Sequence, residues 1–168
     1  MKYIHLGNEE LSEFFFNPIR NRVGWIKPTG GLWCSEYKED TISSWHEWCH
    51  AENFHEGRLD CGTIFEIKDN ARIFIIDKFS DLLYLSEHYE LKDGVISTFL
   101  SSLDFESIAK DYDAIKLTEN GEHETRFSTP SLYGWDVESM LIMDFDIIKN
   151  QKSFKNNQKG IDSTFALW

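Results

Sequence analysis

Three short segments, far apart in the chain, carry residue types that could bind and act on a ligand. The first, a β-prone run near the N-terminus, contains His5, and the second contains Trp33 and Ser35 directly after a pair of glycines. The third opens with Glu138 and continues as an apolar run. A carboxylate at the start of such a run must be paired, reached by solvent or functional, because an isolated charge is costly to bury.

Tryptophan side chains are concentrated around the second segment. The helix expected after it places Trp45, Trp48 and Cys49 on one face, since residues three and four apart are neighbours on a helix. Tryptophan faces attract cations. Asp136, two positions before Glu138, competes with that glutamate for an acidic role.

The sequence contains little that indicates a common nucleotide-binding motif, a metal site or a catalytic nucleophile. The nucleotide-binding patterns G-x-G-x-x-G and G-x-x-x-x-G-K-[ST] are missing, and so are H-E-x-x-H and G-x-S-x-G. His46 and His50 lie one helical turn apart, a minimal metal geometry, but a solvated helix face explains them as well, and we predict no metal site. Cys34 is an alternative nucleophile, although a free cysteine in a strand is usually a small core residue.

Short strands with helices between them are expected to carry these residues. Alternating apolar residues, caps and turn residues predict both kinds of element. The predicted strands are residues 3–6, 31–35, 61–67, 71–76, 114–117 and 137–143; the predicted helices are 9–16, 44–52, 81–89 and 104–110. Ser44 with Glu47 and, separately, Asp104 are expected to cap helices.

The segments between these elements are expected to be turns and loops. A tight turn at residues 68–70 would join the strands on either side of it, and residues 118–131 read as a mobile loop. The polar stretch after Ile148 reads as a tail. Period-two alternation in the last strand places Glu138 on the face opposite Val137 and Ser139.

Length and composition predict one mixed α+β domain over residues 1–168. The net charge of -12, from 29 acidic against 17 basic residues, disfavours a partner held mainly through phosphates. Three cysteines without a C-x-x-C pair favour a reducing, cytoplasmic location. The N-terminus has no long apolar run, so neither export nor a membrane partner is expected.

Taken in order, the three segments resemble the diphtheria-toxin-like His-Tyr-Glu branch of the ADP-ribosyltransferase superfamily. In that family a histidine, an aromatic residue followed by Ser or Thr, and a strand-leading glutamate lie on three core strands. The resemblance implies two small abutting β-sheets around an NAD cleft, with flanking helices. Trp33 stands where tyrosine is usual, and the family's His-Gly-Thr ending is missing after His5.

The resemblance also implies a role for each matching residue. His5 would hydrogen-bond the adenosine ribose of NAD, Trp33 would be the first aromatic, and Ser35 would steady the site. Trp45 or Trp48 would lie over the nicotinamide, and Glu138 would be the catalytic glutamate.

The function implied is mono-ADP-ribosyl transfer from NAD to a protein or nucleic-acid acceptor, as in small toxins, phage effectors or defence proteins, some of which have a cognate antitoxin. A second hypothesis is a non-enzymatic, acidic inhibitor or anti-defence protein that blocks a basic surface of a partner. The charge of -12 favours this second hypothesis, whereas the scattering of the acidic residues speaks against it. A third is a binding module that keeps the fold without the chemistry.

Overall fold

Seven strands form one mixed sheet in the part of the chain that the computed structural model describes, residues 1–22, 25–91 and 103–155. The strands are β1 (Lys2–Leu6), β2 (Leu32–Glu36), β3 (Cys61–Ile67), β4 (Ile73–Ile76), β5 (Ala114–Leu117), β6 (Ser139–Ile142) and β7 (Ile148–Lys155). Four α-helices lie between them: α1 (Ser44–Ala51), α2 (Phe79–His88), α3 (Phe105–Asp111) and α4 (Glu119–Thr125). This is the mixed α+β class that the sequence predicts.

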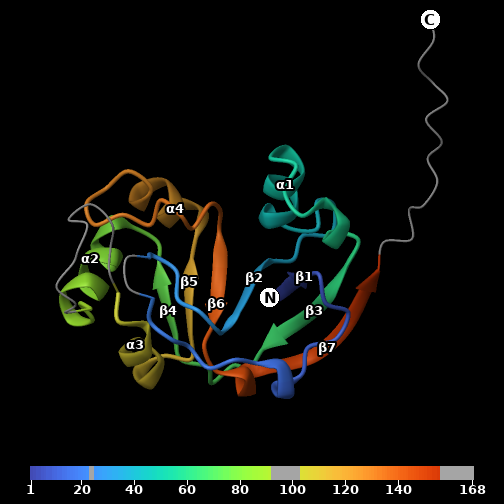
Figure 1. The fold of residues 1–168 in the computed structure, drawn as a ribbon, viewed down its shortest axis with the longest axis horizontal. Coiled ribbons are helices and arrows are strands. Elements are labelled where there is room, and N and C mark those ends of the chain that lie inside the picture. The colour runs from blue at the N-terminus through green and yellow to red at the C-terminus, as the bar shows by residue number, and fades with distance from the viewer. Residues whose placement is uncertain (23–24, 92–102, 156–168) are drawn as a thin grey trace, which may run out of the picture.

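The strand order across the sheet is β4-β5-β6-β2-β1-β3-β7, with only β4 and β5 parallel. β1 and β2 are paired only at Tyr3 with Glu36 and at Ile4 with Ser35, whereas β1 pairs with β3 along its whole length. The structure therefore has one continuous sheet instead of the two abutting sheets that the resemblance implied, because β1 and β2 are paired; the two halves of this sheet meet at that narrow junction. Figure 1 shows the halves as two lobes on either side of β2 and β1.

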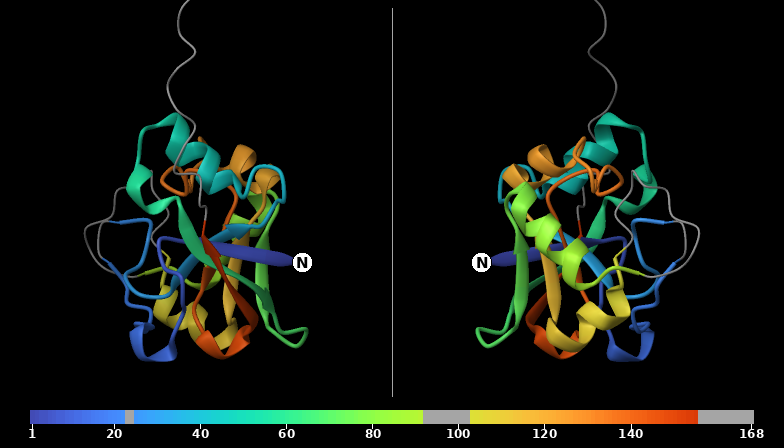
Figure 2. Two further views of the ribbon diagram at one scale, coloured as in Figure 1. Left: turned by 90° about the vertical axis from the view of Figure 1, so that its right-hand side faces the viewer. Right: turned by 90° about the vertical axis from the view of Figure 1, so that its left-hand side faces the viewer.

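Each face of the sheet is covered by its own apolar cluster. Leu82 and Leu85 of α2, with Phe105 and Ile108 of α3, pack against one face of β5 and β6. On the other face, residues of both halves meet in a second cluster built around Phe65, which is fully buried. Figure 1 and Figure 2 place α1 and α4 at one end of the sheet and α3 at the opposite end.

The two helix caps that the sequence predicts are present, but the cap of α1 is shifted by one residue. Asp104 accepts a hydrogen bond from the Ser107 amide and begins α3, as predicted. α1 is capped by Ser43 rather than Ser44, because the Ser43 hydroxyl accepts from the His46 amide at 3.1 Å. The preceding serine thus satisfies the free N–H groups of the first turn.

Two helix assignments differ from the sequence prediction. Within residues 9–16 only a 3₁₀ turn, Glu13–Phe15, is formed; Phe14 is 87% exposed, so a helix here would bury little apolar surface to stabilise it. Conversely, residues 118–131 contain α4 instead of a mobile loop. Thr118 caps α4 through the Gly121 amide, and Gly121 packs against β4.

Strand pairing also departs from the expected hairpin. β3 and β4 are consecutive in sequence but lie in different halves, because β3 pairs with β1 and β7 while β4 pairs with β5. The turn at residues 68–70 therefore takes the chain from one half to the other. The polar stretch after Ile148 forms edge strand β7 as far as Lys155; the remainder of the predicted tail lies outside the described residues.

Candidate functional site

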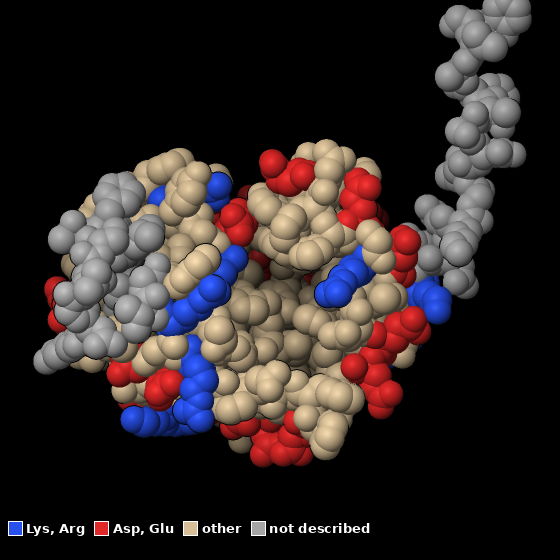
Figure 3. All heavy atoms as spheres, viewed as in Figure 1, with Lys and Arg blue, Asp and Glu red and all other residues tan. Residues whose placement is uncertain are grey.

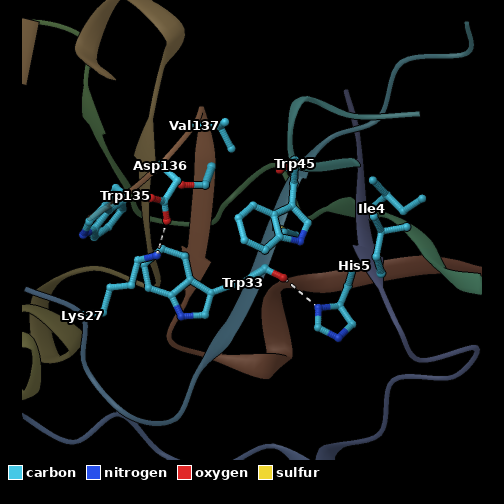
Figure 4. Close-up of a pocket in the computed structure, with 12 residues that line it drawn as sticks. Ile4, His5, Lys27, Trp33, Trp45, Trp135, Asp136 and Val137 are labelled. Carbon is cyan, nitrogen blue, oxygen red and sulfur yellow. Dashed lines mark hydrogen bonds and ion pairs between the residues drawn. The ribbon is translucent and has the colours of Figure 1, made fainter. Parts of the chain in front are cut away.

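A pocket of about 250 Å³ opens where β1 and β2 separate. His5 comes from β1, Trp33 and Ser35 from β2, and Trp45 from α1. Figure 3 shows the surface hollowed between the two lobes, and Figure 4 shows the side chains that line the pocket. Four of the six residues predicted from the sequence thus reach one cavity, although they lie far apart in the chain.

His5 bridges the gap between the two diverging strands. Its Nδ1 lies 2.7 Å from the Trp33 carbonyl oxygen, and since a carbonyl only accepts, Nδ1 carries the proton (Figure 4). Burial lowers the pKa of His5, so the ring is neutral at physiological pH. Its Nε2 is then an acceptor, and the Asn8 side-chain amide lies 3.1 Å from it.

Indole rings and one ion pair form the opposite wall. Trp33 packs edge-to-face on Trp135, with ring centroids 4.7 Å apart. The Lys27 ammonium lies 5.3 Å from the centroid of the Trp33 ring and 3.1 Å from an Asp136 carboxylate oxygen. Figure 4 shows this pair bordering the cavity. A cation already rests on the Trp33 face, in keeping with the attraction expected between the two.

The two tryptophans of α1 have different positions. Trp45 lines the pocket, whereas Trp48 stacks behind it with ring centroids 5.0 Å apart and planes 11° apart. Their spacing puts both on one side of the helix, but only the first reaches the cavity. Trp45 is therefore the α1 ring placed to meet a ligand there.

Ser35 and Glu138 connect β2 to the segment that leads into β6. The Ser35 hydroxyl donates to the Glu138 backbone carbonyl at 3.4 Å, which suits a residue that steadies the site. The Glu138 side chain does not line the pocket, although its neighbours Val137 and Ser139 do. It lies on the other face, as the period-two alternation predicts.

Glu138 is a buried carboxylate with incomplete hydrogen bonding. The side chain is 9% exposed; its Oε2 accepts from the Glu36 amide at 3.4 Å, and its Oε1 has no partner in the described structure. Burial raises the pKa of Glu138, while the Glu36 amide and the Lys116 ammonium oppose that rise. Lys116 itself is 3.3 Å from a Glu36 carboxylate oxygen.

Cys34 lines the same pocket but is a poor candidate nucleophile. It is buried, and its thiol approaches the Met140 carbonyl at 3.6 Å. Burial and the charge of Glu138 raise the pKa of Cys34 well above its usual value, so the group is a thiol rather than the reactive thiolate. The Glu138 carboxylate is therefore close enough to Cys34 for its charge to act on that thiol.

Three further residues line the pocket, and they differ in how well the sequence predicts them. Lys27 belongs to no motif, because its role depends on a partner more than 100 positions away in the chain. Trp135 could be expected only from its nearness to Glu138. Asp136 is the competing acidic residue of the sequence analysis, and unlike Glu138 it lines the cavity.

The described residues can be compared with the requirements of a metal-ion cluster and of a membrane-spanning helix. Across residues 1–22, 25–91 and 103–155, no three His, Cys, Asp or Glu side chains come close enough together to hold a metal ion. In the same ranges, every helix is too short or too polar to cross a bilayer.

Comparison of the chain with family models, with curated proteins and with solved structures finds no match. Functional assignment therefore depends on the residues and geometry of the pocket.

Proposed function

We propose that the protein is a mono-ADP-ribosyltransferase that cleaves NAD and transfers ADP-ribose to a macromolecular acceptor. One observation carries the proposal. The three segments that resemble the family lie on neighbouring strands, in the order β6-β2-β1, and His5, Trp33, Ser35 and Trp45 line one pocket at the junction of the two half-sheets. The resemblance requires a cleft at this place.

The pocket suits the nicotinamide end of NAD. Trp33 and Trp45 present indole rings to a cavity of about 250 Å³, smaller than the roughly 300–1,000 Å³ of pockets that enclose a whole ligand. The pocket would therefore hold the nicotinamide end of NAD beside the indole rings, while the adenosine end passes His5 and extends along the hollow seen in Figure 3. An aromatic face attracts the cationic nicotinamide ring by roughly 0.5–2 kcal/mol.

His5 provides a fixed, neutral hydrogen-bond acceptor. Because Nδ1 donates to the Trp33 carbonyl, Nε2 is the acceptor of the ring, and a ribose hydroxyl of NAD would take the place of the Asn8 amide that lies 3.1 Å from it. The family resemblance assigns that hydroxyl to the adenosine ribose.

A carboxylate is needed because cleavage of the nicotinamide–ribose bond develops positive charge on the sugar, and a negative charge stabilises that transition state. The charge of Asp136 is already paired with Lys27. Glu138 does not line the pocket, but it has an unpartnered oxygen and its charge acts on Cys34 of the pocket wall. We therefore propose the catalytic role for Glu138, which requires its side chain to turn toward the pocket when NAD binds.

The test is nicotinamide release from NAD by the purified protein, with and without cell lysate as the source of acceptor. Glu138→Gln should lower release by about 100-fold or more, the effect expected when a group that stabilises transition-state charge is removed. Asp136→Asn should have a smaller effect, and Glu87→Gln, an exposed carboxylate on α2, should have none.

The outcomes separate the hypotheses. Release that depends on Asp136 but not on Glu138 would move the catalytic role to Asp136. If the wild-type protein neither binds NAD nor releases nicotinamide, the proposal is wrong and the acidic-inhibitor hypothesis takes its place.

A further inference from the structure

We propose that aromatic rings on α1 and the following turn form a docking platform for an arginine side chain of a basic acceptor protein. The aromatic platform consists of Trp45, Trp48, Phe54 and His55. This inference rests on the proposed function, because it names the class of acceptor that the same site would serve.

The four rings of the aromatic platform contact one another. Trp45 and Trp48 are stacked in parallel, and Phe54 meets both edge-to-face, with centroids 6.0 Å and 5.6 Å away. The His55 ring follows, 4.0 Å from Phe54. The chain reaches this arrangement through left-handed backbone at Asn53 and His55, which turns it back after α1 ends.

The aromatic platform runs from the pocket to the surface. Trp45 lines the pocket, while Phe54 is 40% exposed. A group that rests on the outer rings is therefore close to any sugar held in the pocket, which is where an acceptor has to be placed. An exposed set of rings at the edge of a concave site is a typical feature of a binding surface.

Acidic residues lie close in sequence to the rings of the aromatic platform. Glu52 comes one helical turn after Trp48, on the same side of α1, and Glu47 and Glu56 are exposed nearby in sequence. Figure 3 shows acidic side chains on two sides of the lobe that carries α1. The whole chain has a net charge of -12.

A guanidinium group fits this combination better than other groups do. It is flat, always charged, stacks on aromatic faces and forms paired hydrogen bonds with a carboxylate. A lysine ammonium shares the charge but not the flat face. A nucleic acid would bring phosphates close to the glutamates, so the platform favours a basic protein over a nucleic-acid acceptor.

The experiment uses hexa-arginine and hexa-lysine peptides as probes, with binding followed by tryptophan fluorescence at about 0.15 M salt. Hexa-arginine should bind the full chain about two- to five-fold more tightly than hexa-lysine, because lysine also attracts an aromatic face and one whole exposed contact sets the upper limit. Phe54→Ala and Phe54→Leu should both remove this preference; the leucine variant keeps apolar volume and protects the test against unfolding. Phe127→Ala, which removes a 77%-exposed ring elsewhere, should keep the preference.

Equal affinity for the two peptides, or an arginine preference that survives both Phe54 variants, would overturn the platform. Tighter binding of a single-stranded oligonucleotide than of hexa-arginine would overturn it in favour of a nucleic-acid acceptor. NAD cleavage is measured separately on the same samples. Cleavage without arginine preference refutes only the platform, and arginine preference without cleavage refutes only the proposed function.

Discussion

Glu138 combines two roles that oppose each other, since the burial that makes it a strong candidate for catalysis also costs stability. Burial raises its pKa in the folded chain, in spite of the Glu36 amide and Lys116. Compared with the unfolded chain, the fold therefore makes the ionised carboxylate of Glu138 less favourable than the protonated form. The stability that depends on this group is fully present below the ordinary pKa of glutamate and is lost as the pH rises through the raised value.

Glutamine resembles the protonated form at every pH, so Glu138→Gln should raise the melting temperature at neutral pH. The gain should grow as the pH increases from about 4 to about 7, because only the wild-type residue has to ionise. Thermal unfolding of both proteins across this range checks the prediction. The exposed Glu87→Gln variant should show no such trend, and a constant difference for Glu138→Gln would contradict the argument.

At the scale of elements, the contact between α4 and β4 shows why the segment before β6 is held in place. A side chain on Gly121 would put its Cβ 2.1 Å from the Ile76 carbonyl oxygen, so the helix can lie this close to the strand only with glycine there. The Thr125 hydroxyl donates to the Gly121 carbonyl and tightens the same turn. From α4 the chain continues to Trp135 and Asp136 in the pocket wall.

Gly121→Ala should therefore destabilise the protein by about 2 kcal/mol, within the range expected for overpacking against backbone. For a chain of this length, that corresponds to a fall in melting temperature of about 4–8 °C. Gly57→Ala is the matched control, because no atom lies within 4 Å of its added Cβ. Equal melting temperatures for the two variants would show that α4 can move away from β4 at little cost.

At the scale of the molecule, the net negative charge should act in opposite directions on the two proposed ligands, NAD and a basic peptide. Figure 3 shows acidic groups spread around the rim in separate clusters, with Lys and Arg on both sides of the hollow. A net charge of -12 repels an anion such as NAD at long range and attracts a basic peptide. Among the residues that line the pocket, Lys27 is the basic one, and its charge is paired with Asp136.

Raising the salt concentration from about 0.05 M to about 0.5 M should therefore act differently on the two ligands, because it screens long-range charge. The affinity for hexa-arginine should fall strongly, while the affinity for NAD should change little or rise. Titrations of both ligands in the same buffers test this. A parallel fall of both affinities would mean that local cations, rather than the overall charge, govern NAD binding.

Features that depend on near neighbours could be predicted from the sequence: the strands around His5 and Trp33, the Asp104 cap, the shared face of Trp45 and Trp48, and the side of the strand that Glu138 takes. Periodicity and capping are local, so they can be read from a few residues at a time.

Long-range features follow from the packing of the whole fold: the order of the strands, the narrow pairing between β1 and β2, and the contact of Lys27 with Asp136 across 109 positions. These features arise because both faces of the sheet must be covered at once, which no short pattern encodes. The burial of Glu138 belongs with them: its position was predictable, but its unpartnered oxygen depends on what packs around it.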